Sequence, residues 1–311
     1  MKWEKKGLIC SKDSFDLPWF KKNTMVPVPH LLDETTIRIY ITMCDESNIG
    51  RIGYVDVNAE NPSHIKGFSK SPLVDIGIDG AFDDNGVVTA SLLHDGEKLY
   101  MFYSGYQLCI KVPYLIFIGV ALSTDNGRTF KKLTSEVPLL DRTKGELANR
   151  CVPYVIKEGD VYRMWYTASV GNGWVSTPNG KMEPLYDLKY MESKDPLSWP
   201  CAPGKTIITF NNTDEHGICK STIWKEDGIY KIIYSLRHLS KGYRLGYAES
   251  PDGIEWVRMD ERMGLTVSES GFDSDMVCFA ERLEYKDRVY LFYSGNHYGM
   301  EGIGYAVQLE K

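Results

Sequence analysis

Large apolar and aromatic residues alternate with other residues in a short segment, of the form Tyr-x-Met-x-Tyr, that recurs along the whole chain. The copies lie at 37–42, 98–104, 162–167, 230–235 and 289–294, and the first of them is degenerate. This alternation predicts β-strands that pack against neighbouring sheets. The steps between the equivalent residues are 62, 63, 68 and 59, counted from Ile41 through Tyr103, Tyr166, Tyr234 and Tyr293. A strand pattern repeated at such a period is typical of radial blades around a channel.

Each copy has the same kind of neighbours. A first strand precedes it and ends in an acidic or glycine turn, such as Asp95-Gly96 or Asp227-Gly228. A third strand follows it, related to Gly-Tyr-Ala-x-Ser, as at 245–250 and 303–307. Five copies fill the chain. The sequence therefore predicts an all-β fold, a five-bladed β-propeller, as a single domain over residues 1-311.

The last blade is short of one strand at the C-terminal end of the chain. Its third strand ends near 307–309, and no further turn or strand follows. Residues 3–8 resemble the outer-strand segments at 130–133 and 256–259. We therefore expect the N-terminal strand to pair with 303–309 in blade 5 and to close the ring, which removes an exposed sheet edge.

A turn of the form Ser-x-Asp-Gly-x-x-Trp follows the third strand in several blades. The copies begin at Ser123, Ser193 and Ser250. They resemble the Asp-box turns of sialidases, in which the Asp side chain caps turn amides and glycine adopts a positive φ. We expect a structural role for these Asp residues and assign them no catalysis.

Net charge, apolar stretches and cysteine positions indicate which partners the protein binds and in which cell compartment it works. The net charge is −6, from 36 basic and 42 acidic residues, which argues against a nucleic-acid partner. Residues 1–10 lack the apolar run of a signal peptide, and the longest apolar stretch, 115–122, is far short of a membrane span. Three of the seven cysteines, Cys151, Cys219 and Cys278, occupy a position where another blade has Val88. We expect packed, reduced thiols in a cytoplasmic protein.

Acidic residues stand at the start of four inner strands, and they are the main candidates for chemistry. Counting twenty residues back from the motif tyrosine reaches Asp83, Glu146, Asp214 and Asp273. The next two positions add further polar residues, namely Asp84, Glu215, His216 and Asp275. One such Asp is as readily a turn cap as a functional group. Four at one end of a channel predict a site at its mouth.

Charged residues farther along the inner strands fit the same site. Arg150 and Lys220 interrupt apolar segments, and a cation there must be paired or face the channel. His30 and Glu281 lie on two other inner strands. Carboxylates with interspersed cations are suited to sugars, because carboxylates act as acid and base at a glycosidic bond. Five aromatic residues near the rim could stack on sugar rings, although we favour blade packing for them: Trp19, Tyr106, Trp174, Tyr186 and Tyr298.

These features resemble the five-bladed glycosidase superfamily, which includes arabinanases, β-xylosidases, β-fructofuranosidases and mannoside phosphorylases. The resemblance rests on the five-blade arrangement and on the segments 83–86, 214–216 and 272–277. It extends over essentially the whole chain, and the likeness is strongest to uncharacterised glycosidase-like propellers encoded with bacterial surface-polysaccharide enzymes. The resemblance implies the fold more specifically than it implies the reaction.

One part of the family pattern is missing. The hydrolytic families carry a catalytic Asp at the start of the inner strand of blade 1, but residues 23–30 contain no carboxylate and Asp16 is the nearest acid upstream. Either the catalytic group has moved to blades 2, 4 and 5, or the hydrolytic mechanism is absent.

The leading hypothesis is an enzyme that cleaves or transfers a glycosyl unit in the metabolism of a bacterial surface glycan or its precursor, with a carbohydrate or sugar nucleotide as its partner. We expect Asp84, Glu215 and Asp273 to be catalytic. The substrate-binding candidates are Asp83, Glu146, Arg150, His216, Lys220, Asp275, Glu281, His30 and Arg237. No cofactor or metal motif appears in the sequence.

Two alternatives stay open. One is a sugar-binding propeller without catalysis. The other is a phosphorylase or glycosyltransferase, in which Arg150, Lys220, Arg237 and His238 hold a phosphate or a nucleotide diphosphate. Two carboxylates about 6.5–9.5 Å apart across a sugar would favour hydrolysis with inversion. Clustered cations facing a single acid would favour phosphate.

Overall fold

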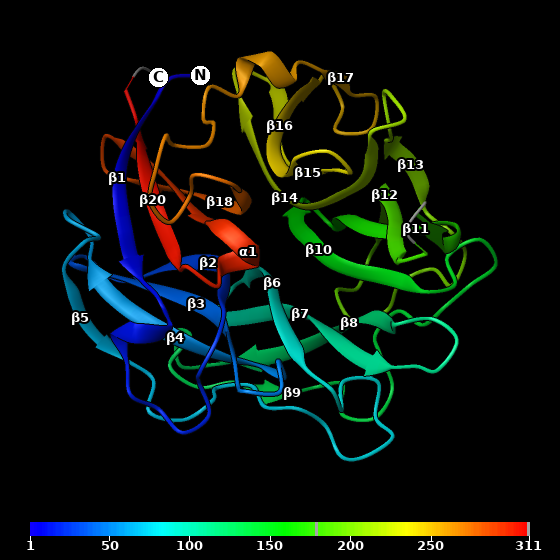
Figure 1. The fold of residues 1–311 in the computed structure, drawn as a ribbon, viewed down its shortest axis with the longest axis horizontal. Coiled ribbons are helices and arrows are strands. Elements are labelled where there is room, and N and C mark those ends of the chain that lie inside the picture. Colours follow the sequence, from blue (N-terminus) through cyan, green and yellow to red (C-terminus); the bar gives the residue numbers. More distant parts are fainter. Residues whose placement is uncertain (178–179, 310–311) are drawn as a thin grey trace.

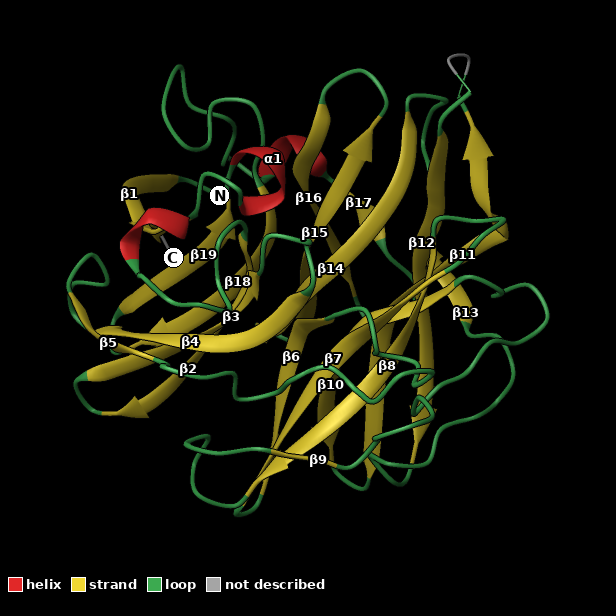
Figure 2. Ribbon diagram, turned by 60° about the horizontal axis from the view of Figure 1, so that its bottom comes forward, coloured by secondary structure: helices red, strands yellow, loops and turns green. Residues whose placement is uncertain are grey.

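The computed structural model describes residues 1–177 and 180–309, and it consists almost entirely of β-strands arranged radially about a central axis (Figure 1). The strands fall into groups of four, numbered in chain order, in which adjacent strands pair antiparallel. Short parallel pairings of β8 with β10 and of β12 with β14 join three of the groups into one sheet. Within a group, the first strand lies nearest the axis and the fourth lies outermost. Helix is limited to three short turns, as Figure 2 also shows: η1 (Lys12–Ser14), η2 (Asp260–Arg262) and α1 (Asn296–Gly299).

The groups follow one another along the chain. Group 1 holds β2 (Thr24–Asp33), β3 (Thr36–Cys44), β4 (Gly50–Asn58) and β5 (Ile65–Phe68). Group 2 holds β6 (Val87–Asp95), β7 (Lys98–Leu108), β8 (Tyr114–Ser123) and β9 (Lys131–Lys132). Group 3 holds β10 (Asn149–Glu158), β11 (Val161–Ser176), β12 (Met182–Ser193) and β13 (Lys205–Ile208). Group 4 holds β14 (Glu215–Glu226), β15 (Ile229–His238), β16 (Gly242–Ser250) and β17 (Val257–Arg258).

Group 5 combines both ends of the chain. It holds β18 (Cys278–Tyr285), β19 (Arg288–Ser294), β20 (Ile303–Gln308) and β1 (Trp3–Cys10). The expected pairing is present: β1 runs antiparallel to β20, from Trp3 opposite Gln308 to Cys10 opposite Ile303 (Figure 1). The N-terminal strand is therefore the outermost strand of the last group.

The motif tyrosine lies over a glycine of the next strand. Tyr103 is opposite Gly119 in the β7–β8 register, and Tyr293 is opposite Gly304 in the β19–β20 register. A Cβ added to Gly119 would lie 2.2 Å from Cζ of Tyr103, which no side chain can tolerate. The Gly-Tyr-Ala pattern thus leaves room for the tyrosine ring to cross the third strand toward the fourth.

The hydroxyl residue after the motif tyrosine connects neighbouring groups. Oγ of Ser104 accepts a hydrogen bond from the Val152 amide at 2.9 Å, and Oγ of Ser235 accepts one from the Phe279 amide at 2.7 Å. Val152 and Phe279 have φ of 45° and 55° at bulges in their first strands, so their amides are turned out of the ladder. These bonds hold the second strand of one group to the first strand of the next around the axis.

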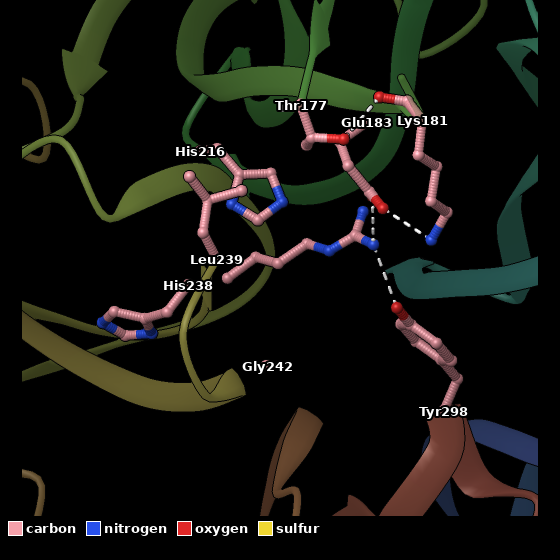
Figure 3. A pocket seen from close by; sticks show the side chains of 9 residues that line it. Thr177, Lys181, Glu183, His216, His238, Leu239, Gly242 and Tyr298 are labelled. Carbon is pink, nitrogen blue, oxygen red and sulfur yellow. Dashed lines mark hydrogen bonds and ion pairs between the residues drawn. The ribbon is translucent and has the colours of Figure 1, made fainter. Parts of the chain in front are cut away.

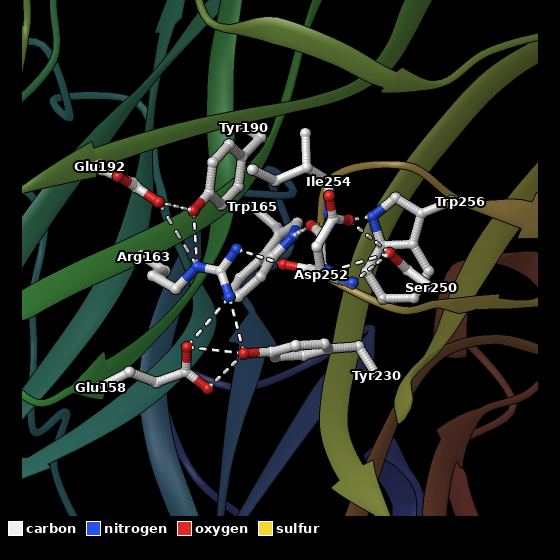
Figure 4. A network of polar contacts seen from close by, with 11 residues as sticks. Glu158, Arg163, Trp165, Tyr190, Glu192, Tyr230, Ser250, Asp252, Ile254 and Trp256 are labelled. Atoms are coloured by element: carbon white, nitrogen blue, oxygen red, sulfur yellow. Dashed lines mark hydrogen bonds and ion pairs between the residues drawn. The ribbon is translucent and has the colours of Figure 1, made fainter. Parts of the chain in front are cut away.

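The Asp-containing turns are structural, as predicted. Oδ1 of Asp252 accepts hydrogen bonds from the amides of Ile254 and Glu255, both at 2.8 Å. Arg163 of group 3 donates to the Asp252 carbonyl and is also held by Glu158 at 3.0 Å (Figure 4). This turn therefore caps its own hairpin and ties group 4 to group 3.

Apolar residues fill the spaces between neighbouring groups. One cluster joins Ile39 and Phe20 to Phe292 and Tyr305, so it seals group 1 against group 5. No helix within the described residues has the length and apolar character needed to cross a membrane.

Candidate functional site

The acids at the strand starts lie apart from one another, because each is bound within its own group. Asp83 is fully buried and accepts hydrogen bonds from the Tyr103 hydroxyl at 3.0 Å and from Nζ of Lys132 at 2.7 Å. Asp273 is 3% exposed and is held in the same way by Tyr293, at 2.9 Å, and by Lys5, at 2.6 Å. We call this set of first-strand acid, motif tyrosine and fourth-strand cation an acid–tyrosine clip.

Groups 3 and 4 have variants of the clip. In group 3, Glu146 accepts from the Tyr166 hydroxyl at 3.0 Å and pairs with Nε of Arg150 at 2.8 Å. In group 4, Arg258 of β17 binds Glu215 at 2.8 Å and also binds Asp260, which accepts from the Tyr234 hydroxyl. In groups 2, 4 and 5 the clip ties the start of the first strand to the fourth strand, whereas in group 3 its cation, Arg150, lies on the first strand itself.

Two other acids predicted at the mouth also lie outside a common site. The Asp84 carboxylate accepts from the Gly80 amide at 2.9 Å and caps its own turn. Asp275 is exposed at the surface, and its carbonyl accepts from Arg244 at 2.8 Å. The structure thus does not bring Asp84, Glu215 and Asp273 together.

Three of the charged residues farther along the inner strands are also engaged elsewhere. Lys220 and Glu281 form an ion pair, and their residues are only 1% and 5% exposed. Burial raises the pKa of Glu281, although the Lys220 charge opposes this. His30 lies at the far end of β2, where Nε2 contacts Oδ1 of Asn126 at 3.1 Å and the ring stacks on His94. The contacts of these three residues are therefore structural, between strands and turns of the fold.

A cavity of about 350 Å³ lies where the first strands begin and the second strands end. We call it the inner cavity, and its wall carries thiols from Cys44, Cys151 and Cys219. Five tyrosines from three groups and α1 also line it: Tyr106, Tyr114, Tyr186, Tyr243 and Tyr298. None of the described residues that line the inner cavity is an Asp or a Glu.

The inner cavity opens into a charged mouth pocket of about 490 Å³, which shares Arg237 and Tyr298 with it. Nη2 of Arg237 donates to Oε2 of Glu183 at 2.7 Å and to the Tyr298 hydroxyl at 3.0 Å (Figure 3). Oε1 of Glu183 pairs with Nζ of Lys181 at 2.6 Å. Burial disfavours the charge of Glu183, but Lys181 and Arg237 outweigh it and lower its pKa. Glu183 is therefore an ionised carboxylate between two cations.

Two histidines complete the mouth pocket. His216 is 4% exposed, and within the described residues neither ring nitrogen makes a well-formed hydrogen bond. Burial and the Arg237 charge lower its pKa to about 4, although the Asp214 backbone and carboxylate act in the other direction. His238 is half-buried, and its pKa is lowered by burial and by Lys241. At neutral pH both imidazoles are thus uncharged.

Local backbone geometry places these side chains. His216 is the second residue of β14, at a register shift in the β14–β15 ladder, and Arg237 lies opposite the next residue, Gly217. A Cβ on Gly217 would lie 2.6 Å from the Tyr186 ring, so glycine is needed for Tyr186 to stand in the wall. Tyr298 has a φ of 58°, a left-handed conformation that is uncommon outside glycine and concentrates at ligand clamps.

Of the residues predicted for the leading hypothesis, His216 and Arg237 line this site, and His238, named for the phosphate alternative, lines it too. Three of the five rim aromatics, Tyr106, Tyr186 and Tyr298, line the inner cavity, while Tyr186 also belongs to a buried cluster and Tyr106 packs against Tyr114. The sequence analysis missed Lys181 and Glu183, which lie around the long β11–β12 hairpin.

A usable signal for the site was present in the repeat. Cys44, Tyr106 and Arg237 all stand three residues after the motif position, and all three line the inner cavity. Counting forward by three would have found them, whereas counting back by twenty found the clips. No group of three or more His, Cys, Asp or Glu in the described part of the chain could hold a metal ion.

No family model matches the chain. Two Mycobacterium tuberculosis proteins, uncharacterised protein MT1551 of strain CDC 1551 and uncharacterised protein Rv1502 of strain H37Rv, are each 30% identical to it over 307 residues, or 99% of both chains. Among solved structures, a glycoside hydrolase superposes with a TM-score of 0.70 at 16% identity, over 99% of this chain and 92% of that one. A thermostable family-43 glycoside hydrolase gives a TM-score of 0.67 at 16% identity, over 94% and 92% of the two chains.

Proposed function

Because this chain belongs to the same family as the Mycobacterium tuberculosis protein Rv1502 and has the fold of the glycoside hydrolase β-propellers, we propose that it is a carbohydrate-active protein that binds a glycosyl unit in its inner cavity. The proposal includes a single domain of five blades, one for each strand group, with β1 closing the ring. We also propose that the protein acts in the cytoplasm, in the metabolism of surface glycans or their precursors.

The tyrosine wall of the inner cavity supports a sugar ligand. Tyrosine offers a flat apolar face for a sugar ring and a hydroxyl that both donates and accepts hydrogen bonds. The Tyr186 and Tyr243 hydroxyls contact each other in the wall, and the Tyr298 ring packs edge-on against Tyr243 at 5.9 Å. A concave, mostly apolar site with a few converging polar groups is the usual form of a small-molecule site. This wall is the observation that carries the proposal.

The distribution of carboxylates argues against hydrolysis by an acid pair. That mechanism needs two carboxyl groups on opposite sides of the scissile bond. The inner cavity has none among its described lining residues, and the mouth pocket has Glu183, which is already paired with two cations. Asp84, Glu215 and Asp273 stay outside the proposal, because turn amides and clip partners engage their carboxylates.

A second candidate, glycosyl transfer to or from phosphate, is favoured by the mouth pocket. Lys181, Arg237 and two histidines surround the single acid Glu183. Within the described residues, Arg237 keeps Nε and Nη1 for a phosphate, and Glu183 is the one carboxylate for proton transfer, which is what a phosphorolytic or transferase site would use.

The test of sugar binding is calorimetric titration with a panel of neutral hexoses, pentoses and short oligosaccharides. We expect saturable binding to at least one of them, and Tyr243→Phe should weaken it by about 3- to 10-fold, the range of one hydrogen bond. Tyr162→Phe is the matched control, because its hydroxyl bonds to Asp95 at 2.6 Å away from the cavity. Equal losses in both variants, or no binding to any saccharide, would overturn the proposal.

A further inference from the structure

The mouth pocket contains a guanidinium with unused donors. Within the described residues, Arg237 makes its hydrogen bonds through Nη2 alone, to Glu183 and Tyr298. Its Nε and Nη1 therefore stay available for a ligand. The side chain is 13% exposed, and its guanidinium lies 5.7 and 5.8 Å from the ring centres of Tyr243 and Tyr298. The guanidinium thus lies near two aromatic rings and lines both pockets.

His216 is a second, independent polar group at the same place. It lines the mouth pocket beside Arg237, and it is 4% exposed. A buried imidazole without a well-formed hydrogen bond is costly unless a ligand supplies the partner. Figure 3 shows its ring beside the extended guanidinium side chain that bonds to Glu183 and Tyr298.

Charge in the mouth pocket also leaves room for an anion. Lys181 and Arg237 are cations, and Glu183 is the single carboxylate among the described lining residues. The lining carries one more positive than negative charge, which favours an anion, and Asp214 acts on both histidines from outside the lining. Within the described residues, Glu183 accepts a hydrogen bond from Nη2 of Arg237 and from no other guanidinium nitrogen.

We propose that Arg237 and His216 bind an oxyanion carried by the sugar ligand, most simply a phosphate attached to the sugar. This inference rests on the proposed function: the sugar ring occupies the inner cavity and its anionic group reaches into the mouth pocket. A guanidinium matches the geometry of a phosphate or a carboxylate through two parallel hydrogen bonds. A uronate carboxylate offers the same chemistry, so the experiment includes both kinds of ligand.

The test is calorimetric titration of the full chain with glucose, galactose and mannose 1-phosphates, with the parent hexoses, with glucuronate and galacturonate, and with inorganic phosphate. We expect one sugar phosphate to bind about 10- to 100-fold more tightly than its parent sugar, the range expected for charge-assisted hydrogen bonds. Tighter binding of a uronate than of any sugar phosphate would overturn the assignment to phosphate and leave the oxyanion site in place.

Substitutions test which side chains bind the anionic group of the ligand. Arg237→Gln should reduce binding of the charged ligand to the level of the neutral one, and His216→Asn should reduce it by a smaller factor. Arg244→Gln is the matched control: its Nη1 donates only to backbone carbonyls, among them those of Lys241 and Asp275. Affinity of Arg244→Gln should equal that of the unmodified protein.

The outcomes separate this inference from the proposed function. If a neutral sugar binds as tightly as its phosphate, the oxyanion site is wrong and the sugar site stands. If inorganic phosphate binds in an Arg237-dependent manner but no saccharide binds, the oxyanion site stands and the sugar site is wrong. If neither binds, both fail. These titrations of the unmodified protein decide the matter even if Arg237→Gln does not fold.

Discussion

The acid–tyrosine clips and the tyrosine-lined cavity with its mouth contain similar residue types, but they differ in how completely their polar side chains are hydrogen-bonded. In the clip of group 5, Asp273 receives hydrogen bonds from both Tyr293 and Lys5. In the mouth pocket, His216 has no well-formed bond within the described residues, and Arg237 uses one of its nitrogens. A polar group that its own sheet satisfies stabilises the fold, whereas one left open inside a concave wall is suited to a ligand.

The difference follows from where each residue lies on the sheet. Clip residues lie in or next to the strands of a single group, and the contacts that define each clip are made within that group. Cavity residues come from the axial ends of strands in several groups, where no fourth strand reaches them. Residue type alone therefore does not separate structural residues from candidate ligand-binding residues in this fold. The position along the second strand is more informative: the motif tyrosine belongs to a clip, whereas the residue three positions later lines the inner cavity in several groups.

The strongest disruption of a clip should come from deletion of residues 2–8. This removes Lys5 from Asp273, exposes the edge of β20 and removes Trp3, which packs against the group 5 core. We expect a loss of about 5 kcal/mol in the free energy of unfolding, from lost burial and an unpaired buried acid. Chemical denaturation of the deleted and full-length proteins measures this loss of free energy.

Lys6→Gln is the control for the deletion, since Nζ of Lys6 pairs with exposed Glu4 at 2.8 Å. This substitution should change stability by less than about 0.5 kcal/mol. An unchanged unfolding midpoint after the deletion would show that β1 does not hold the last group together.

A single substitution isolates the clip of group 3. The side chains of Glu146 and Arg150 are each 1% exposed, so Glu146→Gln leaves a buried guanidinium without its counter-charge. We expect a loss of about 3–5 kcal/mol in unfolding free energy. Affinity for a cavity ligand should stay unchanged while the protein is folded. Exposed Glu136→Gln is the control, and a similar small effect in both variants would contradict a structural role for Glu146.

The cavity can be altered without touching a clip. Gly217→Ala places a methyl group against the Tyr186 ring and should push that ring into the inner cavity. We expect a stability loss of about 1–3 kcal/mol from overpacking, together with loss of most ligand binding in titration. Gly67→Ala is the control, because nothing lies within 4 Å of the added carbon. Unimpaired binding by Gly217→Ala would exclude Tyr186 from the ligand site.

The smallest effect is a pH dependence of stability that comes from His216. Its pKa of about 4 in the folded protein lies below the ordinary value of 6.5, because burial and Arg237 oppose protonation. Between these values the unfolded chain binds more protons, so stability is lost as pH falls from 6.5 toward 4. Solvent at the mouth reduces this loss to roughly 1 kcal/mol at pH 5. His216→Gln should flatten that part of the curve, and exposed His64→Gln should not.

The repeat was enough to predict the β-strands and the N-terminal pairing, because both follow from local alternation and from one missing strand. The Asp turns were also predictable, since their chemistry lies within a few residues. The clips were misread because an acid twenty residues before Tyr103 does not reveal that Lys132 will reach it. Glu183 was missed because Arg237 reaches it from another strand group, 54 positions later in the chain, and its neighbour Lys181 alone does not mark a site.

The pairing of β1 with β20 has a consequence for how the protein is made. The strand β1 has its hydrogen-bonding partner about 300 positions later in the chain, with Trp3 opposite Gln308. Until β20 has been synthesised, the edge of β1 is open to other molecules, and contacts between such distant segments form slowly. Between the synthesis of these two strands, the nascent chain therefore carries an unpaired strand edge. The charged residues Glu4, Lys5 and Lys6 make that edge less prone to pair with another chain.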